Sequence, residues 1–235
     1  MKKIIALCVI ASMLFSGCYN GKGSLPKATE TKPVTAAPSP MLDSLKSAKT
    51  IKVSEAIISL GKKYTISADG AVIGTVTGNF IHLLGDTFEM KDTKGNLVAT
   101  EKQIKRWGVK ANRQAEFDDA NGNTEGYFTE TVFQDLLNPG YVFHFYNPDK
   151  KEIGMSDQIV LSLLKKNVMT NTDGSKAYVV NKQLNLIRDE YDITVKDSSS
   201  IRPDMAVFMV CIEDAIKDAA KDAAKKAQKI KKKKK

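Results

Sequence analysis

The chain has 235 residues, of which 42% are hydrophobic and 27% are charged, and this balance excludes a disordered protein, a collagen and a multipass membrane protein. Its formal net charge of +9 lies mainly at the two ends. Residues 217–235 carry ten lysines against two aspartates, and without them and the two N-terminal lysines the chain has 24 basic and 25 acidic residues. The remaining domain is near neutral, so we expect no nucleic-acid-binding function.

The N-terminus has the pattern of a secretory signal. Two lysines precede a twelve-residue apolar run, residues 4–15, and the small residues Ser16 and Gly17 follow it. Such a run is too short for a stable transmembrane helix, which takes about 20 residues. We therefore interpret residues 1–17 as a signal peptide.

The residues before Cys18 resemble the lipobox of bacterial lipoproteins, although Phe15 replaces the leucine preferred three residues before the cysteine. The resemblance implies that Cys18 carries a diacylglyceryl group and an acylated amino group, palmitate included. Cys211 is the other cysteine expected in the mature chain, and we expect it to be buried. We expect a protein lipid-anchored in the cell envelope, on the outer membrane or facing the periplasm if the cell has two membranes. An ordinary signal with an incidental cysteine is the alternative.

Residues 18–47 are predicted to form a disordered linker. The segment is rich in Pro, Thr and Ala, has few apolar residues, and contains prolines at positions 26, 33, 38 and 40. It cannot bury enough apolar surface to fold, so we expect an extended tether between the anchor and a domain at residues 48–216.

The domain has the pattern of an antiparallel β protein. Short apolar runs alternate with Asp, Asn, Gly and Pro turn signals at fairly even spacing. Residues 191–195 alternate apolar and polar side chains, as a strand with one buried face does. Residues 158–166 fit either a helical turn or a strand. The ten predicted strands are 64–67, 72–80, 87–91, 97–102, 108–117, 126–132, 141–146, 152–155, 177–180 and 191–195.

A buried helix is predicted over residues 204–216. Pro203 and Asp204 suit a first helical turn, and eight consecutive apolar residues, 205–212, then cover every side of a helix. Eight residues rise about 12 Å, which is far less than a bilayer, so the surrounding medium should be protein. An apolar strand of the same length is the alternative. Ten strands before one wholly apolar helix indicate a barrel wrapped around that helix.

At this point the sequence resembles the tubby C-terminal-like superfamily, and within it the LURP-one-related branch. The resemblance implies a barrel of about twelve antiparallel strands closed around a central hydrophobic C-terminal helix, with two further strands from residues 51–60 and 159–168. Members of the wider superfamily bind phosphoinositide head groups or are linked to phospholipid scrambling, whereas the LURP-one branch has no established chemistry. The segments that carry the resemblance are 59–66 with 69–70, 74–78, 88–100, 189–193 and 212–214.

The sequence predicts no catalytic site, metal site or cofactor. His82 and His144 lack a cysteine, carboxylate or second histidine at ligand spacing, and we expect His144 to be a hydrogen-bonded structural residue. Residues 118–123 are acidic but lack the downstream glutamate of an EF-hand, so a hairpin turn is the preferred interpretation. No phosphate loop, dinucleotide fingerprint or nucleophile elbow is present.

Two basic groups are candidates for an anionic surface. The first lies beside Trp107, and a solvated strand end is its alternative role. The second is the end of the tail, residues 217–235, whose first part should continue the helix and whose last part should be disordered by self-repulsion. A merely solubilising tail is the alternative. The candidates are Lys102, Lys105 and Arg106 in the first group and Lys229, Lys231, Lys232, Lys233, Lys234 and Lys235 in the second.

These observations favour a monomeric, membrane-anchored, non-enzymatic lipoprotein that binds or scaffolds anionic lipid or cell-wall polymer. A carrier of a small apolar ligand inside the barrel is the alternative, but the predicted central helix would occupy the space that the ligand needs. An enzyme of unknown type is a third possibility.

Overall fold

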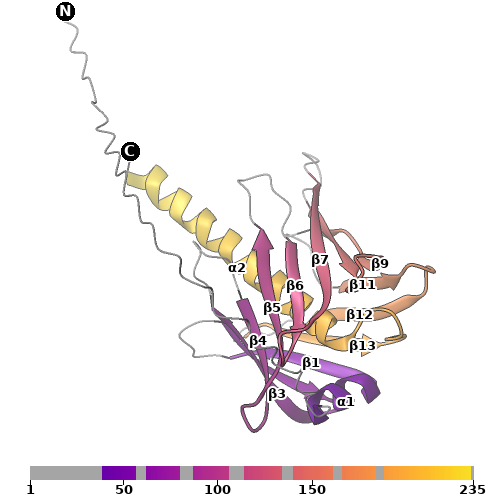
Figure 1. Cartoon of the computed structure of the whole chain (residues 1–235). Helices are drawn as coiled ribbons and strands as arrows, with labels where there is room; N and C mark the ends of the chain where they lie inside the picture. The colour runs from indigo at the N-terminus through magenta and orange to yellow at the C-terminus, as the bar shows by residue number, and fades with distance from the viewer. Residues whose placement is uncertain are drawn as a thin grey trace, which may run out of the picture. The chain divides into compact units, whose positions relative to one another are not determined.

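The computed structural model describes residues 39–56, 62–79, 87–105, 114–133, 140–160, 166–183 and 188–233. Two helices and thirteen strands lie within these ranges (Figure 1). The elements are α1 (Pro40–Ser47), β1 (Thr50–Glu55), β2 (Lys62–Ala68), β3 (Ala71–Asn79), β4 (Thr87–Asp92), β5 (Leu97–Lys105), β6 (Gln114–Asp119), β7 (Thr124–Phe133), β8 (Gly140–Tyr146), β9 (Glu152–Ser156), β10 (Ile159–Val160), β11 (Lys166–Asn171), β12 (Lys176–Gln183), β13 (Glu190–Val195) and α2 (Pro203–Lys233).

Twelve of the described strands form one closed antiparallel barrel. Strands β8 to β1 pair in reverse chain order, β1 pairs with β13, and the sheet continues through β12 and β11 to β9. A pairing of β9 with β8 closes the ring, and the two-residue strand β10 adds to the other side of β8. The predicted barrel of about twelve antiparallel strands is therefore confirmed.

The ten strands predicted from turn signals all correspond to observed strands. The strand predicted at 108–117 is observed as β6 from Gln114, and residues 108–113 lie outside the described ranges. The two further strands expected from residues 51–60 and 159–168 appear as β1 and as the pair β10 and β11. The ambiguous segment 158–166 contains β10 and the first residue of β11.

Helix α2 fills the barrel, as the apolar run predicted. It begins at Pro203, and every residue from 203 to 215 is buried. Figure 1 shows it passing between β5, β6 and β7 on one side and β12 and β13 on the other. Phe208 is fully buried and lies 5.9 Å, centroid to centroid, from Phe117 of β6. Within the described ranges, neither helix has the length and apolarity needed to cross a bilayer.

Helix α1 corrects the predicted linker boundary. Residues 40–47 were placed in the disordered linker, but they form a helix whose Met41 and Leu45 are buried against the barrel. The spacing of four puts both side chains on one helix face, and Pro40 occupies a first-turn position where the missing N–H costs nothing. Pro40 therefore starts the helix rather than preventing it.

The end of α2 is a second correction. The last part of the tail is predicted to be disordered, yet the helix continues through residues 231–233, while Lys234 and Lys235 lie outside the described residues. The buried part already supplies the helix nucleus, and each further residue then needs only propagation. Lysine and alanine propagate a helix well, and self-repulsion among the lysines does not stop it before Lys233.

Truncation of Phe208 tests the enclosed helix. Phe208→Ala is expected to lower the free energy of unfolding by about 3–5 kcal/mol, because it leaves a cavity in a packed lumen. Val72→Ala is the control, since Val72 is 57% exposed and should change stability by less than about 0.5 kcal/mol. Urea unfolding followed by circular dichroism measures both. Equal small effects would contradict the enclosed position.

Candidate functional site

The first group of predicted surface residues is only partly described. Lys102 lies on β5, is 54% exposed, and its ammonium contacts the Asp118 carboxylate at 2.6 Å. That hydrogen bond raises the pKa of Lys102. Lys105 is the last residue of β5 and its side chain is not described, while Arg106 and Trp107 lie outside the described residues. A joint basic surface at these residues remains a prediction.

The other predicted positions either belong to α2, with side chains that are not described, or lie outside the described residues. Lys229 and residues 231–233 belong to the last turns of α2, and their side chains are not described. Cys18, His82, Lys234 and Lys235 lie outside the described residues. These assignments stay predictions.

Two interpretations of polar residues are confirmed. The Nδ1 atom of His144 lies 3.0 Å from the Oε1 atom of Glu152 on the neighbouring strand, as a structural histidine requires. The acidic segment at 118–123 is a hairpin turn, where Asp119 accepts hydrogen bonds from the backbone N–H groups of Asn121 and Asn123, both at 2.8 Å. Cys211 is buried, as expected.

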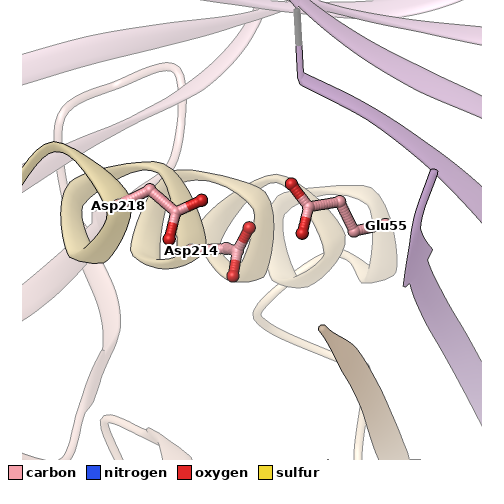
Figure 2. Close-up of side chains that lie close together, drawn as sticks. All are labelled: Glu55, Asp214 and Asp218. Atoms are coloured by element: carbon pink, nitrogen blue, oxygen red, sulfur yellow. The ribbon is translucent and has the colours of Figure 1, made fainter. Parts of the chain in front are cut away.

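A charged cluster that sequence patterns did not predict lies where α2 leaves the barrel. The Lys62 ammonium donates to the carboxylates of Asp214 at 2.8 Å, Glu55 at 2.5 Å and Asp218 at 2.5 Å. We call these four residues the helix-exit cluster. Figure 2 shows the Glu55 carboxylate beside those of Asp214 and Asp218, which come from successive turns of α2.

The fold explains why these residues meet. Asp214 and Asp218 are four residues apart, which puts both on one face of α2. Glu55 is the last residue of β1 and Lys62 the first of β2, so the two flank the loop between paired strands. The end of that hairpin therefore contacts the helix face that carries the two aspartates.

Two tyrosines complete the environment of Asp214, whose side chain is fully buried. Tyr64 donates its hydroxyl to Oδ2 at 3.0 Å, and Tyr191 donates to Oδ1 at 2.8 Å. Burial raises the pKa of both phenols, and the neighbouring Asp214 carboxylate raises them further. Both tyrosines are therefore held as neutral donors, and every Asp214 oxygen has a partner.

The electrostatics of the cluster centre on Lys62. Burial by itself lowers the pKa of this ammonium, but the Asp214 charge and the hydrogen bonds to the three carboxylates outweigh it, and the net shift is upward. Lys62 therefore stays charged. Its charge compensates three carboxylates, of which that of Asp214 is fully buried, and a buried charge without compensation is costly.

The three carboxylates also have the spacing of a cation site, since one oxygen from each lies within 4.8 Å of the others. Oxygen ligands of this kind suit calcium or magnesium. The Lys62 ammonium, however, already contacts all three residues and takes the position of the cation. The arrangement is therefore an internal ion cluster that fixes α2 to β1 and β2.

The other end of the buried helix has its own ion pairs. Arg202, one residue before α2, donates from Nε and Nη2 to the two oxygens of Asp204 at 3.1 and 2.8 Å. Its Nη1 also contacts Glu125 at the start of β7. The Asp204 carboxylate lies in the first helical turn, where the helix dipole favours a negative charge. Ion pairs thus hold both ends of the buried segment.

Glu213 is the buried carboxyl next to the cluster. It is 3% exposed, and burial raises its pKa to about 7. The charge of Asp214 also raises the pKa, whereas Asn167 of β11, Lys182 of β12 and Lys217 of α2 act in the opposite direction. Glu213 is therefore the carboxyl here whose charge changes near neutral pH.

Comparisons with known proteins define no family. No family model and no curated protein matches the sequence. Among solved structures, the chain is similar to the X-ray structure of a protein from Arabidopsis thaliana, with 14% identity and a TM-score of 0.46 over 76% of this chain and 98% of the other. The barrel closed around its own helix is therefore a finding of this structure alone.

The helix-exit cluster can be tested at Lys62. Lys62→Met is expected to destabilise the protein by about 3–5 kcal/mol, because three carboxylates lose their shared cation. Lys63→Met is the matched control, since Lys63 is the exposed neighbour on the same strand and should change stability by less than about 0.5 kcal/mol. Millimolar calcium should raise the thermal midpoint of Lys62→Met and leave the wild type unchanged. A wild-type midpoint that rises with calcium would show that Lys62 does not fill the site.

Glu213 gives the protein a defined pH dependence. Its ordinary pKa of 4.5 is raised to about 7 in the folded state. The folded state therefore binds more protons between these values, and the stability from protonated Glu213 is lost as pH rises through this window, by a few kcal/mol at about 1.4 kcal/mol per pKa unit.

Glu213→Gln should remove that slope. The difference in unfolding free energy between the wild type and this variant, followed from pH 4.5 to 8, isolates Glu213 from groups with the opposite slope such as Asp69 and Asp92. A flat difference curve would contradict the raised pKa.

Proposed function

We propose that the protein is a membrane-anchored, non-enzymatic lipoprotein whose barrel displays a basic helix to anionic lipid or cell-envelope polymer. One observation carries the proposal: α2 fills the lumen with its first thirteen residues and then continues to Lys233. The barrel is occupied by its own chain, and the same helix carries the lysine-rich sequence outward (Figure 1).

The filled lumen supports a binding or scaffolding role over a carrier. The side chains of residues 205–212 are at most 6% exposed, and they lie where the cargo of a barrel carrier would lie. At the helix exit, the buried Asp214 carboxylate is engaged with Lys62, Tyr64 and Tyr191, as in a structural cluster. This arrangement favours a protein without a reaction centre.

The helical form of the tail supports a role at a charged surface. From Ala215, the last residue of α2 that is described as buried, to Lys233 the helix rises about 27 Å at 1.5 Å per residue. The lysine-rich segment is thus held away from the near-neutral barrel. Each lysine near an anionic membrane contributes about 1 kcal/mol to the binding free energy. Salt at physiological concentration limits this attraction to lysines within about 8–10 Å of the surface.

The anchor in this proposal is Cys18. A lipid at Cys18 would hold the domain in the cell envelope through a linker that ends at α1, where the chain packs on the barrel. The sequence resemblance to the tubby C-terminal-like superfamily, in its LURP-one-related branch, agrees with a barrel around a central helix. We assign the chain to that superfamily as part of the proposal.

Two variants separate the anchor from the basic helix. In a bacterial host, the wild type should fractionate with membranes and show acyl mass on its N-terminal peptide, whereas Cys18→Ser should lose both. The purified Cys18→Ser protein should then float with anionic liposomes but not with neutral ones.

Glutamine at Lys229 and at positions 231–235 should reduce that binding about tenfold or more, because six charges near the surface are lost.

Salt and a matched variant serve as controls. Glutamine at Lys49, Lys52, Lys94, Lys151, Lys176 and Lys196, all outside α2, removes the same charge and should leave flotation nearly unchanged. Binding to anionic liposomes should fall as salt is raised from 50 to about 300 mM. Salt-insensitive flotation, or an equal loss in both six-lysine variants, would contradict a role for the helix end.

A further inference from the structure

Four hairpin turns of the barrel share one backbone conformation. In each five-residue turn, the first residue donates its N–H to the carbonyl of the fifth and accepts from the N–H of the fourth, with distances of 2.9–3.1 Å. The turns run over residues 92–96, 119–123, 147–151 and 171–175. An Asp or Asn side chain at the first position accepts from a backbone N–H in each of the first three turns.

The fourth position of these turns lies in the left-handed region of φ, which favours glycine. Three turns have glycine there: Gly95, Gly122 and Gly174, with φ of 87°, 82° and 87°. The remaining turn has Lys150, with φ of 61°. A lysine in this conformation costs free energy that glycine does not. Local turn geometry therefore gives no reason for Lys150, and a role for its side chain can explain it.

The Lys150 side chain lies over an aromatic ring on the outer face of the barrel. Its Nζ atom is 5.7 Å from the ring centroid of Tyr127, within the range of a cation–π contact. Tyr127 of β7 faces Tyr146 of β8 in the strand register, and both rings are only partly buried. The turn thus places an ammonium beside a pair of tyrosines.

These residues surround a hollow of about 360 Å³. Gln114 and Thr129, which face each other across β6 and β7, add an amide and a hydroxyl to its wall. Ala115 and Phe128, which also face each other across β6 and β7, are buried and belong to its lining. The hollow lies outside the barrel and has aromatic, hydrogen-bonding and cationic groups on one small surface.

The chemistry of these groups selects a ligand class. Tyrosine rings receive the flat C–H face of a sugar ring, while an amide, a threonine hydroxyl and phenol hydroxyls pair with sugar hydroxyls. The exposed ammonium pairs with a carboxylate. The volume suits one or two sugar rings. We propose that this hollow binds an acidic saccharide, with Lys150 on its carboxylate and the ring against Tyr127 and Tyr146.

This site is separate from both the basic helix and the helix-exit cluster, so its test does not depend on the proposed membrane role. Two pairs of probes isolate the carboxylate: glucuronic acid against glucose, and N-acetylmuramic acid against N-acetylglucosamine. Both sugars of the second pair carry an acetamido group, and N-acetylmuramic acid also carries a lactyl carboxylate. Comparison of the two pairs therefore shows whether the site prefers a uronic acid or an acidic amino sugar of the cell-wall type. Ligand-observed NMR titration measures each dissociation constant.

The wild type should bind the acidic member of at least one pair about three- to fivefold more tightly than the neutral member, as a partly exposed charge pair provides. Lys150→Gly should abolish that preference while raising the thermal midpoint by about 2–4 °C, because it restores the residue that the turn favours. Gain of stability with loss of binding distinguishes a ligand-binding lysine from a structural one.

Lys151→Ala is the control, since Lys151 is the exposed neighbour in the same turn and does not line the hollow. It should keep the preference for acidic sugars. The proposal is overturned if no acidic sugar binds better than its neutral partner, if both lysine variants lose the preference equally, or if Lys150→Gly lowers the thermal midpoint, which would make the tyrosine contact a stabilising one.

Discussion

The structure depends on the need to surround an α-helix that has no polar face. Eight consecutive apolar residues, 205–212, leave no side of α2 that water can cover. Only a complete wall removes all of that surface from solvent, and the closed ring of twelve strands supplies it. Closure also leaves no unpaired edge among those strands, which protects a large antiparallel sheet from association. The helix and the barrel thus require each other.

The enclosure of the helix also requires that charged groups at its two ends are compensated. A helix that passes from a low-dielectric lumen to solvent brings polar groups to each boundary, where they need partners. Arg202 compensates Asp204 at the entrance, and Lys62 compensates Asp214 at the exit. Glu213 is the exception, because its burial raises its pKa to about 7 and its charge is lost by protonation instead. The protonation of Glu213 therefore contributes to how stability changes near neutral pH.

Local patterns in the sequence were sufficient for the strands and the buried helix. Alternation, turn residues and an apolar run each act over a few residues, so they can be recognised in one sequence. The sequence does not predict helix α1, because the prolines at positions 26, 33, 38 and 40 indicate a linker and outweigh the spacing of Met41 and Leu45. The helical end of α2 is not evident from the sequence, because repulsion among lysines argues against a helix, whereas propagation from the buried part extends it.

The candidate sites were harder to predict, for a physical reason. Lys62 and Asp214 are 152 residues apart, and only the closure of the barrel brings them together. The residues Asn147, Pro148 and Asp149 are a turn signal, but they do not reveal that Lys150 takes a left-handed conformation. The tyrosine pair beside it depends on the register between β7 and β8. Sites built from distant strands leave no local signal.

The unbroken course of α2 has a mechanical consequence. The helix has 31 residues and no glycine or proline after Pro203, so its inner and outer parts form one stiff rod of about 46 Å. A force or torque applied near Lys233 has no hinge in which to dissipate, and it acts directly on the packing inside the lumen. A partner that binds the outer end of α2 can therefore act mechanically on the core of the barrel.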